Sequence, residues 1–441
     1  MDRGPVRPHD RRGTLSRTVI TMEMRPFGHL VSVEQARRRL LRAAVPVEGE
    51  ESIPLADAVG RIAAETVRAP APVPPVDRAT WDGYAFASSN TRAASPARPV
   101  TMPIVGEVFA DECFRHSVPR GSAVAIATGG EIARGTDTLE IFERVRRHGS
   151  RLRIDHPVRP GQYIAPIGHD FAQGALLARK EEPLLPSALG SLAAAGRPRI
   201  RVYRAPIVAI VPNGNELLSP GARPRPNHIY ESNNATLSAI VRAAGGIPRP
   251  MRPVVDDPDQ IEETLRRAAR SSDVVIATGG SSVGEHDYLP RIFPRLGKLL
   301  FHGIAVRPGK PTLAARSRRT LFVGMPGHPT SCLANGFWLL LPALRRMARL
   351  PGPGWVDQSI RLASDADRLT PGLATVVPIR VEGHRGHPTF HDSHAITSLS
   401  GVNAFAILPP GNRAVRRGER LVVHRLLPPL GDPAFPAPAN R

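Results

Sequence analysis

The chain contains little cysteine, little lysine and few aromatic side chains. Its two cysteines, Cys113 and Cys332, are too few for a disulfide framework or a cysteine-rich metal site, and they fit a reducing compartment. Aromatic residues make up 5% of the chain, too few for the stacking platforms that bind single-stranded nucleic acid. Of the 59 lysines and arginines, three are lysines: Lys180, Lys298 and Lys310.

Long apolar runs are also missing. The longest apolar stretch, from Cys332 to Leu344, is about half as long as a bilayer span requires, and we interpret it as a core helix. The first residues lack the apolar segment of a signal peptide. We therefore expect a cytoplasmic protein without a membrane partner.

The net charge of +20 would normally suggest a nucleic-acid partner. Here the excess is almost entirely arginine and is spread along the whole chain, which indicates a bias in composition rather than a binding face. We therefore expect no nucleic-acid partner, and a charge-driven nucleic-acid binder is the weakest of our hypotheses.

A chain of 441 residues is too long for one ordinary core, so we expect several domains. The pattern predicts a multidomain α/β protein with a central doubly wound α/β domain, a β-rich inserted domain and a small C-terminal β domain. The predicted parts are a basic tail (1–28), an elongated linking domain (29–69 and 173–203), the β-rich insert (70–172), the α/β domain (204–352), the C-terminal β domain (353–428) and a second tail (429–441).

The central α/β prediction rests on buried strands that alternate with helices. Strands are predicted at Ile207–Val211, Val274–Ala277 and Leu321–Val323, and helices at 235–244, at 261–269 and from Ser331. Such alternation produces a parallel sheet, which binds ligands at the carboxyl ends of its strands. Asn213, Thr278 and Gly324 each follow a strand end, so we expect their loops at one rim.

Two of these loops, together with a basic turn between them, suit an anionic ligand. Thr278 to Tyr288 is a turn rich in glycine and hydroxyl groups that follows a buried strand, where backbone N–H groups can cradle phosphate-like oxygens. Arg307 to Thr312 holds an arginine and one of the three lysines on a Pro-Gly turn, and Gly324 to Ser331 follows. A lysine retained at position 310 supplies a compact point charge rather than a planar fork.

Carboxylates are dispersed among these segments in a way that suits Mg²⁺, which keeps its waters and uses one or two carboxylates with a substrate phosphate. For most single acids a solvated or helix-capping role is the better explanation. Asp82 is the exception, because it is held in the turn Trp81-Asp82-Gly83-Tyr84. The other acids are Glu140, Glu143, Glu216, Glu231, Asp256, Asp257, Glu285 and Asp287.

Together these segments resemble the molybdopterin molybdenumtransferase family, from about Val31 to His424. The resemblance implies four domains, a homodimer, and a cleft between the α/β domain of one subunit and the β insert of the other. It implies that molybdate enters adenylylated molybdopterin with Mg²⁺ and that AMP is released. The matching segments are Asp77–Ala85, Ala127–Gly130, Pro212–Leu217 with Ile229–Asn234, Thr278–Tyr288, Arg307–Pro311, Gly324–Ser331 and Ser393–Leu399.

The resemblance also implies roles for single residues. Gly279, Gly280, Ser281 and Ser282 would hold the pterin phosphate, and Arg307, Lys310 and Ser331 would attract molybdate. Thr128 would contact the nucleotide side, and Asp82, Asp256 and Asp257 would place Mg²⁺ or the attacking water. The expected catalytic residues are Asp82, Thr128, Asp256, Asp257 and Lys310. Further residues expected to contact the substrate are Asp287, Pro326, Pro329 and Ser393. The expected metal ligands are Asp82, Glu231 and Asp257. Molybdopterin adenylyltransferase and the apoproteins of molybdoenzymes are the expected protein partners.

The sequence departs from the family pattern at several positions. His169 and Asn215 stand where acids are usual, His328 replaces an asparagine, and Leu373 stands near an expected arginine. Glu231 replaces an aspartate and keeps the charge. Loss of two acids favours an alternative hypothesis, in which a divergent, non-catalytic paralogue binds molybdopterin for storage, delivery or sensing. The retained Asp82, Thr128 and Lys310 favour an active transferase.

Overall fold

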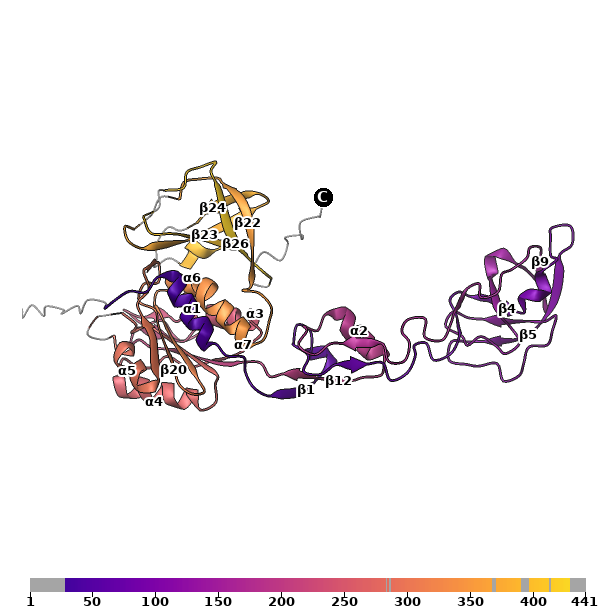
Figure 1. Ribbon diagram of the computed structural model, residues 1–441, viewed down its shortest axis with the longest axis horizontal. Coiled ribbons are helices and arrows are strands. Elements are labelled where there is room, and N and C mark those ends of the chain that lie inside the picture. Colours follow the sequence, from indigo (N-terminus) through magenta and orange to yellow (C-terminus); the bar gives the residue numbers. More distant parts are fainter. Residues whose placement is uncertain are drawn as a thin grey trace, which may run out of the picture. The chain divides into compact units, whose positions relative to one another are not determined.

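The computed structural model describes residues 28–282, 284, 287–366, 370–389, 396–411 and 414–428. The chain divides into two compact units, and each is described here by itself (Figure 1). The larger unit comprises Met1–Val47 and Ala205–Arg441, and the smaller unit comprises Glu48–Arg204.

A six-stranded sheet forms the centre of the larger unit. Its strand order is β16-β13-β17-β21-β20-β18, in which the first four strands are parallel to one another and β20 is antiparallel to both of its neighbours, β21 and β18. The strands are β13 (Ile207–Pro212), β16 (Ile247–Pro250), β17 (Val274–Thr278), β18 (Lys298–His302), β20 (Leu313–Arg316) and β21 (Leu321–Met325). The predicted α/β fold class is thereby confirmed.

Helices cover both faces of this sheet, so its central strands are apolar throughout. In β13, Val208 and Ile210 join one core, whereas Ala209 and Val211 join the other. The helices are α3 (Asn233–Ala243), α4 (Pro258–Ala269), α5 (Leu289–Leu296), α6 (Pro329–Asn335), a π-helical segment (Gly336–Leu340) and α7 (Leu341–Met347).

Helix α1 (Val33–Ala43) begins with a capping box, in which the Ser32 side chain accepts from Gln35 N and the Gln35 side chain accepts from Ser32 N. Its apolar face, with Ala36 and Leu40, is buried in the core beside α7 and β18. The sequence analysis assigned residues 29–69 to the linking domain. The structure instead places α1 in the larger unit, because its apolar face is completed by that core, and the smaller unit begins at Glu48.

The stretch from Cys332 to Leu344 forms parts of α6, the π-helical segment and α7, and it is almost wholly buried. It therefore supplies core helices, as predicted. Among the described residues, no helix has the length and apolarity needed to cross a membrane.

A second sheet of the larger unit is formed mainly by the C-terminal residues. Its order is β19-β23-β24-β22-β26-β25, with β23 also paired to β25. The short strand β19 (Val306–Arg307) pairs with β23 in parallel, so this sheet holds the start of the Arg307 turn. The other strands are β22 (Trp355–Leu362), β23 (Ala374–Glu382), β24 (Arg385–Pro388), β25 (Ala404–Leu408) and β26 (Arg420–Leu426), and β14 (Leu217–Leu218) pairs with β15 (Ile229–Tyr230) elsewhere in the unit.

The smaller unit is rich in β structure. Strands β1 (Glu50–Pro54) and β12 (Arg199–Tyr203) pair, as do β2 (Val67–Arg68) and β11 (Leu176–Ala178), beside helix α2 (Pro186–Ala194). A six-stranded sheet has the order β7-β4-β6-β5-β9-β8. Its strands are β4 (Gly83–Phe86), β5 (Val100–Val108), β6 (Ala123–Ile126), β7 (Thr138–Ile141), β8 (Arg146–His148) and β9 (Arg151–Ile154), and β3 (Arg78–Ala79) pairs with β10 (Ile164–Ala165).

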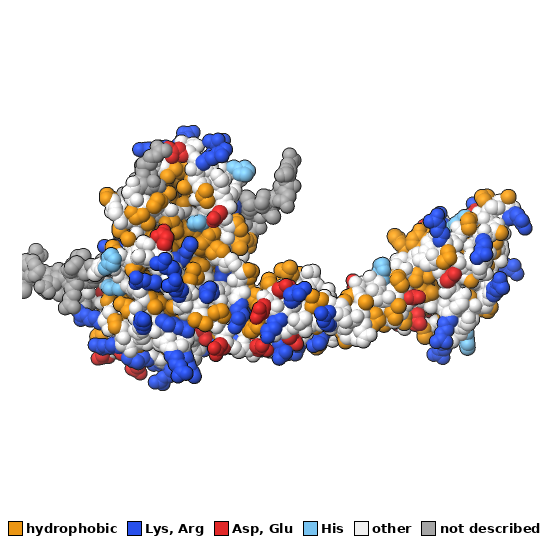
Figure 2. Space-filling model, viewed as in Figure 1, with side chains coloured by type: hydrophobic (Ala, Val, Ile, Leu, Met, Phe, Trp, Pro, Cys, Tyr) orange, Lys and Arg blue, Asp and Glu red, His pale blue; other side chains and the backbone are white. Residues whose placement is uncertain are grey.

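Basic side chains are scattered over the face of each unit shown in Figure 2.

Candidate anion-binding site

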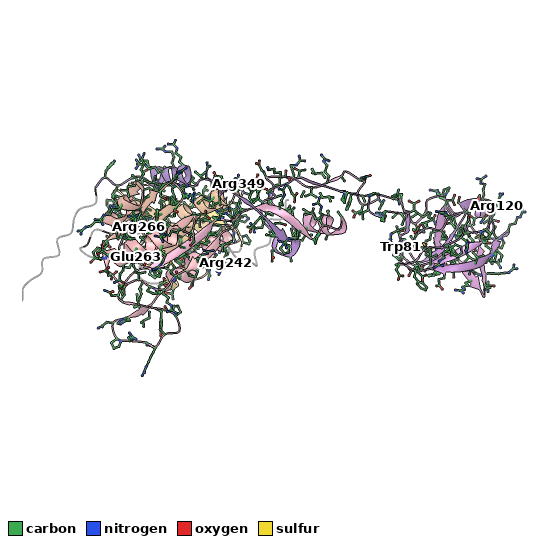
Figure 3. All side chains as sticks on the ribbon, turned by 90° about the horizontal axis from the view of Figure 1, so that it is seen from below. Trp81, Arg120, Arg242, Glu263, Arg266 and Arg349 are labelled. Carbon is green, nitrogen blue, oxygen red and sulfur yellow. The ribbon has the colours of Figure 1, made fainter. Side chains whose placement is uncertain are left out.

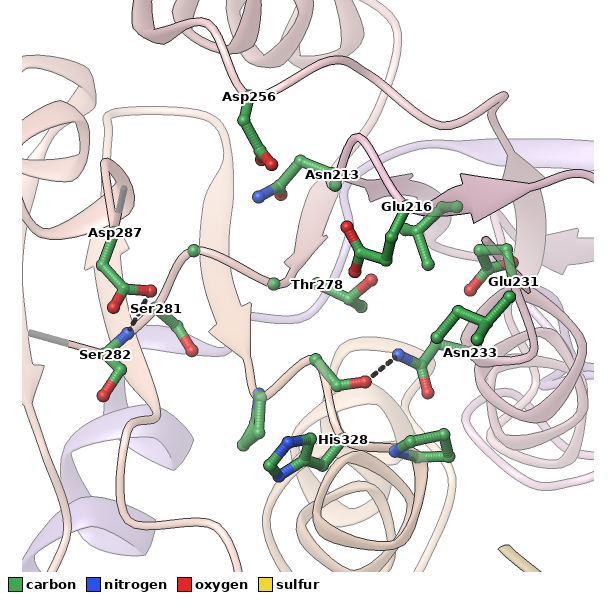
Figure 4. A pocket seen from close by; sticks show the side chains of 18 of the residues that line it. Asn213, Glu216, Glu231, Asn233, Asp256, Thr278, Ser281, Ser282, Asp287 and His328 are labelled. Atoms are coloured by element: carbon green, nitrogen blue, oxygen red, sulfur yellow. Dashed lines mark hydrogen bonds between the residues drawn. The ribbon is translucent and has the colours of Figure 1, made fainter. Parts of the chain in front are cut away.

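A cavity of about 500 Å³ lies at the carboxyl ends of β13, β17 and β21 (Figure 4). Loops that are far apart in sequence meet there because parallel strands end at the same edge of the sheet. The structure thus brings together most of the predicted phosphate-side residues. Those that line the cavity are Gly279, Gly280, Ser281, Ser282, Asp287, Pro326 and Pro329, together with Glu231 and Asp256.

The loop after β17 turns sharply at Gly279, where φ is +88°. A Cβ atom at this position would lie 2.4 Å from the backbone oxygen of Asn213, so a side chain there would collide with the loop after β13. This close contact lets the backbone of the Gly279–Ser282 segment border the cavity directly.

Asp287 orders this loop from its far end. Its carboxylate accepts hydrogen bonds from Ser282 N at 3.0 Å and from Gly284 N at 2.7 Å. Asp287 was predicted to contact the substrate. In the structure it lines the cavity but engages two loop amides, and its negative charge opposes an anion placed beside it. The structure therefore supports a role for Asp287 in shaping the loop after β17.

His302, at the end of β18, lies against the same loop and was not singled out from the sequence. Burial lowers the pKa of His302, while hydrogen bonds with the backbone of Ser281 and Ser282 and the charge of Asp287 act in the opposite direction. The lowered pKa favours a neutral imidazole behind the loop.

A second cavity, of about 280 Å³, adjoins the first, and Pro311 and His328 line both. Arg307, Lys310 and Ser331, the three residues expected to attract molybdate, all line this smaller cavity. Arg307 ends β19, Lys310 lies in the turn that follows it, and Ser331 belongs to α6. The structure therefore brings this predicted set together at one place.

Two further residues, Thr370 and Leu373, also line the smaller cavity. The Arg307 guanidinium donates to Thr370 Oγ1 at 2.9 Å, which directs an otherwise exposed side chain. Leu373, which stands near the position of an expected arginine, also lines this cavity. An arginine at position 373 would therefore add a cation to the wall of the smaller cavity.

The acids of the larger cavity differ in how their oxygens are used. Asp256 Oδ2 accepts from Asn215 N at 3.1 Å, and Asn215 Oδ1 accepts from Asp256 N at 3.0 Å. An aspartate at position 215 would supply the same acceptor oxygen, so this chain keeps the contact and loses the charge. The Glu216 carboxylate points toward the same space as Asp256 in Figure 4.

Glu231 is 3% exposed, and its two carboxylate oxygens accept from Asn234 N at 3.0 and 3.1 Å, in the first turn of α3. Burial raises the pKa of Glu231, although hydrogen bonds from the backbone of Asn234 and Asn233 partly offset this effect. A carboxylate that is buried and engaged in this way caps a helix, which weakens the expectation that it binds a metal.

Asp257 has the same kind of role. It is the N-cap residue of α4, its side chain accepts from Gln260 N at 2.8 Å, and it lines neither cavity. The described residues contain no group of three or more histidine, cysteine or acidic side chains that would hold a metal ion. The expected ligand set of Asp82, Glu231 and Asp257 is therefore not assembled within either unit.

The donor set of the larger cavity nevertheless fits Mg²⁺ in another way. Glu216 and Asp256 both line it, and Mg²⁺ usually binds one or two carboxylates together with water and substrate phosphate. This fit replaces Asp257 by Glu216, a residue that the sequence analysis named as an acid but not as a ligand.

Asp82 and Thr128 lie together in the smaller unit, at the start of β4 and just after β6. Both are exposed, and a hydrogen-bonded contact joins them. Trp81 beside them is 58% exposed (Figure 3). Its ring meets the Tyr163 ring edge to face, with the two ring centroids 6.3 Å apart. His169 is an exposed residue of a neighbouring turn, whose Ile167 N donates to Asp77 Oδ1 at 2.8 Å.

One predicted residue is not covered by the structure, and one residue with a structural role was not predicted. Ser393, expected to contact the substrate, lies outside the described residues. Asn335, which the sequence analysis did not name, holds the turn that carries Lys310. A polar residue inside the apolar stretch from Cys332 to Leu344 was the available signal.

Comparison with known proteins supports this arrangement along most of the chain. Residues 31–196 match the family model for the MoeA N-terminal region (domain I and II), residues 209–346 match a probable molybdopterin binding domain, and residues 361–426 match the MoeA C-terminal region (domain IV). Together, these regions and the two cavities define a multidomain protein with a molybdopterin-binding type of α/β domain.

Similar proteins identify the family. The chain is 28% identical over 418 residues to the molybdopterin molybdenumtransferase of Nostoc sp., covering 91% of this chain and 95% of that protein. It is 30% identical over 404 residues to the molybdopterin molybdenumtransferase of Bacillus subtilis, covering 89% and 93%. The chain belongs to the molybdopterin molybdenumtransferase family, which confirms the resemblance found in the sequence.

A solved structure shows the same fold. The crystal structure of the molybdopterin biosynthesis moeA protein from Pyrococcus horikoshii is 32% identical in sequence and superposes with a TM-score of 0.76, covering 90% of this chain and 99% of that one. The order of the β-rich N-terminal parts, the α/β domain and the C-terminal β sheet is therefore a property of the family.

Proposed function

We propose that this protein is a transferase that inserts molybdate into adenylylated molybdopterin, releases AMP and so completes molybdenum cofactor synthesis. The observation that carries the proposal is the pair of adjoining cavities, of about 500 and 280 Å³, that share Pro311 and His328. A large organic anion and a small inorganic one must meet in this reaction, and two connected cavities of unequal size suit them.

The larger cavity would bind the pterin, with its phosphate on the Gly279–Ser282 loop. Backbone amides and serine hydroxyls stabilise phosphate oxygens there without adding a mobile charge. The smaller cavity would bind molybdate, a tetrahedral dianion, between Arg307, Lys310 and Ser331. A half-buried lysine gives this dianion a charge-assisted hydrogen bond.

Cleavage of the adenylate adds water across a phosphoanhydride bond, so that AMP leaves and the pterin keeps its phosphate. Mg²⁺, when bound, would neutralise charge on the phosphate under attack. Glu216 and Asp256 would hold this ion, and their carboxylates would orient its bound waters. Molybdate would then bind the two dithiolene sulfurs in place of copper or of their protons, and one of its oxygens would take up two protons and leave as water.

We also propose a homodimer in which Asp82 and Thr128 of one subunit complete the site of its partner. The proposal follows the family resemblance, which implies a cleft between the α/β domain of one subunit and the β insert of the other; Asp82 and Thr128 belong to the smaller unit and the residues of both cavities to the larger one. Mixing inactive Asp82→Ala and Lys310→Ala proteins tests this arrangement. In the mixed dimer one of the two sites would be intact, so activity returns; no recovery after subunit exchange would place the whole site within one chain.

The alternative function is that of a non-catalytic molybdopterin binder. It is favoured by His169 and Asn215, which replace acids, and by Leu373, a residue of the smaller cavity that stands near an expected arginine. The upstream adenylyltransferase and the recipient apoproteins remain proposed partners in either case, and a cytoplasmic location remains a prediction.

The deciding experiment supplies purified protein with adenylylated molybdopterin, molybdate and Mg²⁺, and measures AMP and pterin-bound molybdenum together. We expect AMP release to accompany molybdenum incorporation in equal amounts. Pterin binding without AMP release would support the binding protein instead. Omitting Mg²⁺ should slow AMP release while pterin binding persists.

A further inference from the structure

Asn335, at the end of α6, is a fully buried polar residue whose side chain has three hydrogen-bonding partners. Its Nδ2 donates to Gly309 O at 2.9 Å and to Thr312 Oγ1 at 2.7 Å. Its Oδ1 accepts from Trp338 Nε1 at 2.8 Å. Because an indole N–H can only donate, Trp338 fixes the orientation of the amide, with Nδ2 directed at the turn.

The turn has no space for a side chain at Gly309, where it contacts Asn335. Gly309 has a φ of +104°, and a Cβ atom there would lie 2.2 Å from Asn335 Nδ2. Thr312 closes the turn as well, because its hydroxyl donates to Gly309 O at 2.9 Å. Asn335, Gly309 and Thr312 therefore form a compact hydrogen-bonded cluster, which we call the amide clamp.

The clamp joins two chain segments that line the smaller cavity. Arg307 lies at the start of the clamped turn and Lys310 within it, and Ser331 lies on α6 one helical turn before Asn335. Residues four apart on a helix share a face, so Ser331 meets the cavity while Asn335 meets the turn behind it. The separation of the two segments is therefore set by the clamp.

We propose that Asn335 is a positioning residue that fixes the width of the smaller cavity and thereby selects a tetrahedral oxyanion by its size. The inference rests on the proposed function, in which this cavity receives molybdate. Sulfate has the same shape and charge and is smaller, so a cavity of fixed width distinguishes the two ions. A cavity with mobile walls closes around either.

An apolar residue at position 335 would leave the Trp338 N–H without its acceptor, and it would leave Gly309 O with the Thr312 hydroxyl as its one remaining side-chain donor among the bonds described above. Buried groups left unpaired in this way cost more than the bond itself contributes, so the turn and helix would rearrange. The π-helical segment that follows Asn335 is a further irregularity of the kind often found beside functional sites.

The test compares Asn335→Ala with Thr312→Val and Thr312→Ser. Valine removes the Thr312 hydroxyl at nearly constant volume, and serine keeps it. We expect Asn335→Ala and Thr312→Val to raise the molybdate concentration needed for half-maximal insertion roughly tenfold, because each variant loses about one buried hydrogen bond. Sulfate inhibition should be retained, so the preference for molybdate over sulfate falls by about the same factor. Thr312→Ser should keep most of the wild-type preference, and pterin affinity should be unchanged in all three variants.

Asn403→Ala is the matched control. Asn403 is also buried, and its amide also bridges backbone groups, since Oδ1 accepts from Val381 N at 2.8 Å and Nδ2 donates to Val381 O at 3.1 Å. It lines neither cavity. This variant should lose thermal stability, as Asn335→Ala does, and keep the wild-type preference for molybdate.

Direct calorimetric titration with molybdate and with sulfate separates this inference from the proposed function, because it needs no reaction. If the wild type inserts no molybdenum but the clamp variants change the ratio of the two affinities, the proposed function fails and the clamp stands. If folded Asn335→Ala or Thr312→Val keeps the wild-type ratio, or loses pterin and molybdate affinity together, the clamp is overturned. Should Asn335→Ala not fold, the comparison of Thr312→Val with Thr312→Ser decides alone.

Discussion

Asp82 Oδ1 accepts two hydrogen bonds from one residue, Thr128: one from the backbone N–H at 2.6 Å and one from the hydroxyl at 2.8 Å. The backbone bond and then the hydroxyl bond lower the pKa of Asp82, against a small opposing effect of burial. The carboxylate is therefore ionised at neutral pH, and the residue is exposed on the smaller unit. A fixed, charged and accessible carboxylate suits a metal ion or an attacking water.

Two substitutions of Asp82 should separate the effect of its charge on activity from the effect of its hydrogen bonds with Thr128. Asp82→Ala is expected to reduce molybdenum insertion by roughly a hundredfold or more while the protein stays folded, because the residue is exposed. Asp82→Asn keeps an oxygen for Thr128 and removes the charge, so it should be nearly as inactive as the alanine variant. Insertion from adenylylated molybdopterin with Mg²⁺ is the measurement; wild-type rates in both variants would remove Asp82 from the site.

The neighbouring acids Asp256 and Asp257 should behave in opposite ways. Asp257 caps α4, so Asp257→Ala is expected to cost about 1 kcal/mol of unfolding free energy and to leave insertion close to wild type. Asp256 lines the larger cavity, so Asp256→Ala should weaken the response of the rate to Mg²⁺. Denaturant unfolding and Mg²⁺ titration of both variants make the comparison. The reverse pattern would return Asp257 to the metal site.

Glu231 predicts a pH-dependent difference in stability. Burial raises the pKa of Glu231 in the folded state, so its contribution to stability is fully present below the ordinary glutamate pKa and is lost as pH rises through the raised value. Glu231→Gln keeps an oxygen for Asn234 N and cannot ionise. The melting temperature of this variant relative to wild type should therefore increase between about pH 4 and about pH 8. A constant difference in melting temperature across this range would mean that ionisation of Glu231 does not destabilise the folded state.

The elements that sequence could predict are those set by local pattern. The β17 strand was recognisable because a run buried on both faces is apolar throughout, and the glycine turn after it marked the phosphate loop. The Ser32 capping box gave the start of α1. The partner of α1 was not predictable, because an amphipathic face shows that something is buried but not against what.

Side-chain roles were harder to predict for a related reason. An aspartate before a helix is suited both to capping and to metal binding, and only the bond from Gln260 N shows which of these Asp257 performs. The role of Asn335 was hidden because its partners Gly309 and Thr312 lie 26 and 23 residues earlier in the chain. Chain separation of this size leaves no periodic signal.

The assignment of two cavities to two anions is tested most directly by Lys310. A charge-assisted hydrogen bond to a bound dianion typically contributes about 1.5–3 kcal/mol, so Lys310→Ala should raise the molybdate requirement roughly tenfold to a hundredfold. Lys310→Arg should restore this only in part, since a planar fork on the same clamped turn is misaligned. Pterin binding, assigned to Gly279–Ser282, should change little in either variant.

The decisive measurement is therefore a molybdate titration of Lys310→Ala in the insertion assay, with pterin affinity measured separately on the same preparation. If Lys310 binds molybdate, the molybdate requirement rises by at least roughly tenfold and the pterin affinity stays close to wild type. An unchanged molybdate requirement with pterin binding destroyed would contradict it and would exchange the ligands of the two cavities.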